Sequence, residues 1–207
     1  MRAEKKAGNP ILAGTEPTLV MRTCTPWCEV KEKKGERRME RDNDGVPPCL
    51  GLYHANERKT GVALRMWLHP AAEGQPGNIS LSLARQSSHG RFDWWNSVYV
   101  QLGPTDLAKI LMVFTGWTES IANDGAGMDN TIRHTLDNGS VVTVDLSHKV
   151  DPYPSYCLSL VKRGPGMGTE QVQIELSNAE ALAVTEAIRG AMPYVAFGVP
   201  RLAKEEE

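Results

Sequence analysis

RFDWWNSVYVQLGPTDLAKIL, residues 91–111, is the stretch that decides the fold of this chain. Its middle part alternates apolar and polar side chains up to Leu102, which is typical of a half-buried strand. Gly103 and Pro104 then end the strand, and apolar residues follow at helical spacing. Proline suits the first turn of a helix, and Asp106 complements the positive end of the helix dipole. The stretch therefore predicts a strand that leads directly into a capped helix.

The same passage from strand to helix occurs a second time near the C-terminus. VQIELSNAEALAV, residues 172–184, alternates in the same way, and Ser177 and Glu180 have the spacing of a capping box. Further alternating segments precede each passage, and residues 137–140 (DNGS) carry a strong hairpin signal. Residues 58–199 thus contain several strands and a helix, twice. We expect an α+β fold with two antiparallel sheets, built from a duplicated strands-then-helix unit whose helices cover one face of each sheet.

The face of each sheet opposite the helices is predicted to be open. Its side chains combine aromatic rings, hydroxyls and guanidinium groups with few acids. Such a surface is typical of single-strand binding, because bases stack on rings and the phosphate backbone needs cations along its path. Ordinary solvent-facing residues, or rings that fill an interface between copies of the chain, are the alternative interpretation. The residues expected at the nucleic-acid site are Lys59, Arg65, Trp67, Arg85, Arg91, Trp94, Trp95, Tyr99, Arg133 and Lys162, with Arg163 as the alternative to Lys162.

Alternation also divides the aromatic row at residues 92–95. Neighbouring side chains of a strand point to opposite sides, so Phe92 and Trp94 share one side and Trp95 takes the other. Asp93 is then free to accept hydrogen bonds from the backbone of the turn. At least one tryptophan is therefore expected to be structural. The sequence leaves open which of the two faces the open side.

Composition bounds the remaining functions. The 207 residues carry a formal net charge of -2, so a site for a polyanion has to be a local basic patch. Residues 1–57 are predicted to form a charged extension, 58–200 the folded domain and 201–207 a charged tail. There is no secretion signal and no run of roughly 20 apolar residues, so we expect a cytoplasmic protein without a membrane partner. P-loop, nucleophile-elbow and H-E-x-x-H motifs are missing, which indicates that the protein is not an enzyme.

The cysteines suggest one cofactor. Four cysteines are too sparse for a disulfide framework, which favours a reducing compartment. Three of them combine with a histidine in a C-x3-C and C-x4-H spacing that is similar to a zinc site. Unconnected thiols are the alternative, and no other cofactor is expected. The candidate zinc ligands are Cys24, Cys28, Cys49 and His54.

The opening stretch resembles the Whirly single-stranded DNA-binding proteins. Phe92-Asp93-Trp94 stands in the place of the family's Tyr-Asp-Trp corner, and Thr105-Asp106 in that of the Thr-Glu at the following helix start. RKTGVALRMWLHP (residues 58–70) is similar to the family's first strand, and LDNGSVVTVDLS (residues 136–147) to its hairpin. VQIELSNAEALAVTEAIRGAMPYVAFG (residues 172–198) is similar to its last strand and helix.

This resemblance, over about residues 58–199, implies both a fold and a function. The fold would be α+β with two antiparallel four-stranded sheets packed roughly perpendicular to each other. The helices would form the core of a homotetramer, and the protein would be non-catalytic and would bind single-stranded DNA along the sheet edges between protomers, largely without regard to base sequence. The related kinetoplastid guide-RNA-binding proteins share the fold, so single-stranded RNA is an alternative ligand. An oligomeric scaffold that binds other proteins is a second alternative. Residues 59–64, KTGVAL, have one lysine fewer than the family's Lys-Gly-Lys-Ala-Ala-Leu, which argues against ordered assembly beyond a tetramer.

Overall fold

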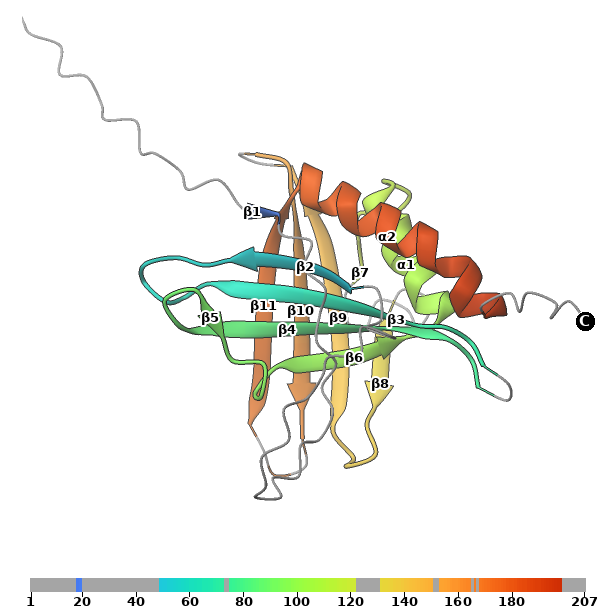
Figure 1. Ribbon diagram of the computed structural model, residues 1–207, viewed down its shortest axis with the longest axis horizontal. Helices are drawn as coiled ribbons and strands as arrows, with labels where there is room; N and C mark the ends of the chain where they lie inside the picture. Colours follow the sequence, from blue (N-terminus) through green and yellow to red (C-terminus); the bar gives the residue numbers. More distant parts are fainter. Residues whose placement is uncertain are drawn as a thin grey trace, which may run out of the picture.

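The computed structural model has two β-sheets and two helices (Figure 1), and it describes residues 18–19, 49–72, 75–121, 131–150, 153–164, 166 and 168–198. The first sheet contains β1 (Thr18–Leu19), β2 (Cys49–His54), β3 (Val62–His69), β4 (Asn78–Ser88), β5 (Arg91–Phe92) and β6 (Val98–Leu102). The second contains β7 (Ser120–Ile121), β8 (Ile132–Thr135), β9 (Val141–Lys149), β10 (Ser155–Arg163) and β11 (Thr169–Ser177). Helix α1 (Pro104–Phe114) follows β6, and helix α2 (Asn178–Phe197) follows β11. The predicted passages from strand to helix are thus confirmed.

Both sheets are antiparallel, and each is mainly four strands wide. β3 occupies one edge of β4, and β5 and β6 share the other. In the same way β10 occupies one edge of β9, and β7 and β8 share the other. The first sheet therefore runs β2, β3, β4 and β5 with β6, and the two-residue β1 lies beside β2. The second runs β11, β10, β9 and β7 with β8. The predicted α+β class with two antiparallel sheets is confirmed, with six strands in the first sheet and five in the second.

The first sheet begins inside the segment that the sequence assigns to the charged extension. β2 pairs with β3 over its whole length, and Leu50 and Leu52 are buried in the core. Only these two apolar side chains face the core from β2, and Gly51 separates them, so the sequence gives a weak strand signal here. The folded part of the chain therefore includes residues 49–57 as well as those from 58 onward.

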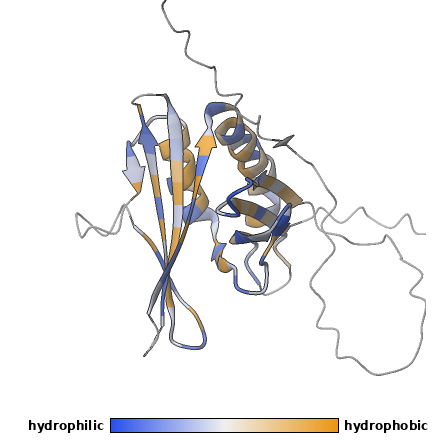
Figure 2. Cartoon of the chain, turned by 90° about the vertical axis from the view of Figure 1, so that its left-hand side faces the viewer, coloured by the Kyte–Doolittle hydropathy of each residue, from blue (hydrophilic) through white to orange (hydrophobic). Residues whose placement is uncertain are grey.

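The strands of the two sheets cross (Figure 1), and their inner faces share one core with the helices. β10 and β11 contact strands of the first sheet, α1 packs on β6, β7 and β9, and α2 packs on β2, β3, β10 and β11. Figure 2 shows apolar and polar residues alternating along the strands, as a half-buried sheet requires. Each sheet is thus covered partly by helices and partly by the other sheet, whereas the strands-then-helix pattern by itself predicts cover by the helices.

Each helix start is anchored by a histidine from the opposite sheet. At the start of α1, Oδ2 of Asp106 lies 3.0 Å from Nε2 of His134 on β8. At the start of α2, Glu180 accepts the Ser177 N–H at 2.9 Å, and its other carboxylate oxygen lies 2.6 Å from Nε2 of His54 on β2. Burial tends to raise the pKa of Glu180, but the hydrogen bonds from His54 and Ser177 outweigh it and hold the pKa below its usual range. The predicted capping box is confirmed, and the duplication extends to how each helix is held.

Candidate nucleic-acid interface

The outer face of the first sheet, which points away from the core, carries three of the predicted site residues. Tyr99 is 49% exposed there, and Arg65 and Trp67 are half-buried. They lie in two neighbouring rows because side chains two residues apart on a strand share a face. The antiparallel register aligns Gly51, Arg65, Ser82 and Tyr99 in one row, and Cys49, Trp67, Ser80 and Gln101 in the next.

One end of this face is closed by an aromatic cluster, which consists of the rings of Tyr53, Phe92 and Trp94. The ring centroids lie 5.7 to 6.5 Å apart in tilted and edge-on arrangements. Ala63 and Ala84 belong to the same face by alternation, and both are fully buried. This end of the outer face is therefore packed rather than open to a ligand.

The structure separates the two tryptophans of the aromatic row. Trp94 is half-buried in the aromatic cluster, whereas Trp95 is 80% exposed. Asp93 fixes the turn that follows, since it accepts hydrogen bonds from Asn96 Nδ2 at 2.8 Å and from the Asn96 N–H at 3.2 Å. These bonds hold the pKa of the Asp93 carboxyl below its usual range. Trp94 is thus a structural ring, and Trp95 is the ring that solvent reaches.

Arg65 is held in place by two rings of the aromatic cluster. Its guanidinium carbon lies 3.8 Å from the centroid of the Trp94 ring, and its Nε donates to the Tyr53 hydroxyl at 3.3 Å. Tyr53 in turn lies across Gly51, where a Cβ atom would come within 2.8 Å of the tyrosine ring. The two terminal nitrogens of Arg65 make no hydrogen bond to any residue that the structure describes. They are a preoriented pair of donors of the kind that binds a phosphate.

The turn between β2 and β3 presents the predicted contact Lys59. The amide of Gln86 is buried and fixes this turn, since its Oε1 accepts the N–H groups of Asn56 at 2.9 Å and Gly61 at 3.2 Å. Gly61 is required there because a Cβ atom would come within 2.0 Å of a backbone oxygen. Lys59 has a φ of 60° and is exposed, and so is the neighbouring Arg58, which the sequence pattern did not single out. Two cations therefore lie on a rigid turn beside the aromatic cluster.

Arg85 and Lys162 do not lie on an open face, so these two predicted placements are wrong. Arg85 has the same alternation as Leu83 and reaches the second sheet, where it pairs with Glu170 of β11 at 3.5 Å. Lys162 has the same alternation as the buried Leu160 and is itself half-buried. The physical reason is the two-residue period of a strand, in which an error of one position reverses the face.

Arg91 and Arg133 are both exposed but belong to different sheets. Arg91 begins β5 and precedes Phe92 of the aromatic cluster. Arg133 on β8 is aligned with Thr143 of β9, on the outer face of the second sheet. Of these two predicted contacts, only Arg91 lies with the cations of the first sheet.

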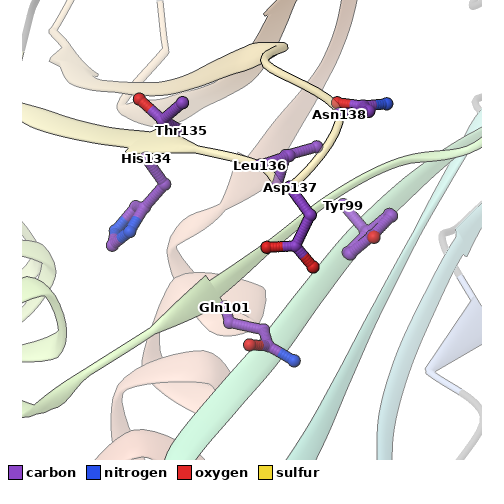
Figure 3. A pocket seen from close by; sticks show the side chains of 7 residues that line it. All are labelled: Tyr99, Gln101, His134, Thr135, Leu136, Asp137 and Asn138. Carbon is purple, nitrogen blue, oxygen red and sulfur yellow. The ribbon is translucent and has the colours of Figure 1, made fainter.

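A pocket of about 450 Å³ lies where β6 meets the β8–β9 hairpin (Figure 3). Tyr99 and Gln101 line it from β6, and Asp137 and Asn138 line it from the hairpin loop. Asn138 fixes the loop by accepting the Ser140 N–H at 3.0 Å, whereas the side chains of Gln101 and Asp137 have no hydrogen-bond partner among the described residues. The sequence did not reveal this pocket, because only the crossing of the sheets brings its two walls together.

The predicted zinc site is not compatible with β2. Cys49 and His54 stand at opposite ends of this extended strand, about 16 Å apart, and alternation turns them to opposite faces. His54 pairs with Glu180, and Cys49 is disulfide-bonded, so these two side chains do not share one metal ion and this pairing is wrong. The disulfide also gives no support to the predicted reducing compartment. Cys24 and Cys28 lie outside the described residues, within which no three His, Cys, Asp or Glu side chains are placed to hold a metal ion.

The two crossing sheets and two helices define a Whirly-like α+β fold, as the sequence predicts. WHY1 from Arabidopsis thaliana superposes with a TM-score of 0.54 at 15% identity, over 72% of this chain and 86% of that one. The plant transcriptional regulator PBF-2 gives 0.55 at 17% identity, over 73% and 83%. Trypanosome MRP1/MRP2 gives 0.51 at 19% identity, over 72% and 86%. No protein-family model and no curated protein matches the sequence. In the part of the chain that the structure describes, neither helix has the length and apolar character needed to cross a membrane.

Proposed function

We propose that the protein binds single-stranded DNA, largely without regard to base sequence, and that it catalyses no reaction. The observation that carries this proposal is the outer face of the first sheet, where Arg65 is preoriented by the aromatic cluster and Tyr99 is exposed, with Trp95 exposed in the turn that leads to β6. Every base can stack on such rings, and the terminal nitrogens of an arginine suit a phosphate. The similarity to the transcriptional regulator PBF-2 supports a nucleic-acid ligand.

The positions of the cations on the first sheet suggest a path for the bound nucleic-acid strand. Arg58, Lys59 and Arg91 are exposed at the end where the aromatic cluster lies, and Tyr99 is on the edge strand β6. A strand that ran from this end toward β6 would meet cations first, then Arg65, and then the exposed ring of Tyr99. Cations along the backbone and rings between them are the two requirements of sequence-tolerant binding.

The test is the binding of the full chain to a fluorescently labelled oligothymidine, measured by anisotropy over a range of salt concentrations. We expect the affinity to fall steeply with salt. In a plot of the logarithm of the association constant against the logarithm of the salt concentration, each contacted phosphate should contribute about −0.7 to the slope. No affinity at low salt, or an affinity independent of salt, would contradict the proposal. Unlabelled duplex DNA and single-stranded RNA serve as competitors. If RNA competes better than DNA, single-stranded RNA is the ligand. The similarity to trypanosome MRP1/MRP2 is the reason to include the RNA competitor.

The helices support a second part of the proposal, a homotetramer assembled through α1 and α2. Met112 on α1 and Leu182 on α2 are 39% and 60% exposed. A pocket of about 440 Å³, lined in part by Phe114 and Leu182, leaves further apolar surface of both helices uncovered. Light scattering coupled to gel filtration gives the mass in solution, and a monomer at micromolar concentration would overturn this part.

Two proposals remain from the sequence alone. A scaffold that binds proteins instead of nucleic acid is the alternative function. A nucleic-acid-binding protein would purify with excess absorbance at 260 nm that a high-salt wash removes, whereas a scaffold would show no such excess. A cytoplasmic location is the second, and cell fractionation with an antibody to the full chain tests it.

A further inference from the structure

The pocket between β6 and the β8–β9 hairpin has a chemistry different from that of the phosphate contacts. Its wall contains a carboxylate from Asp137, an amide from Gln101 and the ring of Tyr99 (Figure 3). It contains no lysine or arginine side chain, and its one histidine, His134, is paired with Asp106 at 3.0 Å. A phosphate is repelled by the carboxylate, so the pocket suits a neutral group that offers hydrogen-bond donors.

The position of the pocket places it beside the proposed path of the strand. Tyr99 is aligned with Ser82, and Ser82 with Arg65, so two strand spacings, about 10 Å, separate the pocket wall from the arginine. A base in the pocket and a phosphate at Arg65 can therefore belong to neighbouring nucleotides of one strand. A volume of about 450 Å³ leaves room for a purine beside the tyrosine ring.

The free carboxylate of Asp137 distinguishes among the bases. An ionised carboxylate is an acceptor only, with two oxygens that suit two adjacent donors. Guanine offers two adjacent donors, N1–H and N2–H, on its Watson–Crick edge. Adenine, cytosine and thymine each place an acceptor next to their donor on that edge, so one carboxylate oxygen would face a lone pair. The Gln101 amide can donate to the O6 acceptor of guanine at the same time.

We propose that this pocket selects guanine from the bound strand, and this inference rests on the proposed single-strand binding. Asp137 accepts from N1–H and N2–H, Gln101 donates to O6, and Tyr99 stacks on the ring. Sequence-tolerant binding along the outer face would then carry a preference for guanine at a single position. A bidentate contact of this kind discriminates against the wrong base by roughly tenfold.

The test compares oligothymidines that differ at one central base, as competitors for one labelled oligothymidine on the full chain. The central base is guanine, hypoxanthine, adenine or thymine, and hypoxanthine lacks only the 2-amino group of guanine. We expect the guanine oligonucleotide to bind about tenfold more tightly than the hypoxanthine one. In Asp137→Asn, which keeps a residue suited to the turn, this ratio should fall to about one. Glu119→Gln, which removes the same charge at an exposed position away from the pocket, should keep it.

The outcomes separate the inference from the proposed function. Salt-dependent binding of the all-thymine oligonucleotide with no preference for guanine would overturn the guanine pocket and leave single-strand binding intact. A preference for guanine that persists in Asp137→Asn would also overturn the role given to this carboxylate. If no oligonucleotide binds the wild-type protein, the proposed function fails, and the inference that rests on it fails with it. Circular dichroism of both variants establishes that they fold.

Discussion

The outer faces of the two sheets differ in their side chains, although both sheets come from the same strands-then-helix unit. On the first sheet, two adjacent rows place Arg65, Trp67 and Tyr99 side by side. On the second, the corresponding face carries acids in neighbouring rows, with Asp145 aligned with Ser159 and Glu175 aligned with Cys157. The comparison teaches that the duplicated unit supplies a shared frame, whereas the side chains of the two outer faces differ, and we expect the face of the first sheet to bind a polyanion more tightly than that of the second.

The shared frame is clearest at the helix starts. Asp106 and Glu180 occupy the same position in α1 and α2, and each carboxylate lies against a histidine of the opposite sheet. In each half, the helix start is thus joined to the sheet of the other half by a carboxylate–histidine contact. The proposed binding surface, by contrast, lies in one half only, so changes to the frame and changes to the face should have separable effects.

The largest effect on affinity is expected from Arg65→Ala. Loss of a charged, preoriented donor pair should weaken binding to oligothymidine by about 2 kcal/mol, roughly thirtyfold, and should lower the salt slope by about one contact. The matched control is Arg163→Ala, which removes an exposed arginine from the second sheet. Anisotropy titrations of both variants test the comparison directly. Equal losses in the two variants would show that both sheets bind.

A nearly equal loss is expected from Trp95→Ala. Removal of one stacking ring should cost about 1 to 3 kcal/mol of binding free energy. Trp117 is the control, because it is 81% exposed, close to the 80% of Trp95, but follows α1 near the start of the second sheet. Trp117→Ala should leave oligothymidine binding unchanged. If quenching of tryptophan fluorescence by the oligonucleotide persists in Trp95→Ala but is lost in Trp117→Ala, the faces are assigned the wrong way round.

Glu180→Gln tests the frame rather than the face. We expect the free energy of unfolding to fall by about 1 kcal/mol at pH 7, because the capping contact weakens, while affinity for oligothymidine is unchanged. The pKa of Glu180 is lowered in the folded protein, so the carboxylate stabilises the fold above its unfolded-state pKa, and this stabilisation is lost as the pH falls through the folded-state pKa. Denaturant titrations from pH 7 to below 4.5 should therefore show a smaller acid loss in Glu180→Gln than in the wild type or in Glu119→Gln.

The smallest effect is expected from Tyr53→Phe. The ring stays over Gly51, and only the hydroxyl that accepts from Arg65 is removed. A hydrogen bond contributes about 0.5 to 1.5 kcal/mol, and this one comes from a charged guanidinium but is long, at 3.3 Å, and only partly buried. The affinity should therefore fall by roughly threefold while the melting temperature changes little. A loss as large as that of Arg65→Ala would instead mean that Tyr53 contacts the nucleic acid itself.

The two-residue alternation of the sequence predicted much of the outer face of the first sheet. Arg65, Trp67 and Tyr99 alternate with core residues along their strands, and the structure places them together on one face. The same period misplaced Arg85 and Lys162, because each was assigned to the face of the residue next to it in the chain. β2 was missed because its core side is short and contains a glycine-separated pair of leucines. No sequence feature besides its charge singled out Arg58. It is a candidate cation of the site because the turn that Gln86 fixes places it beside the aromatic cluster.

The sequence by itself determined the duplicated order of strands and helices, the capped helix starts and the face on which most strand residues lie, because these follow from backbone periods and from hydrogen bonds between near neighbours. Only the tertiary structure decided that Trp94 is packed under Arg65 while Trp95 is exposed, and that Asp137 and Gln101 line one pocket. These arrangements depend on how two sheets cross, and contacts between segments far apart in the chain leave no periodic mark on either segment.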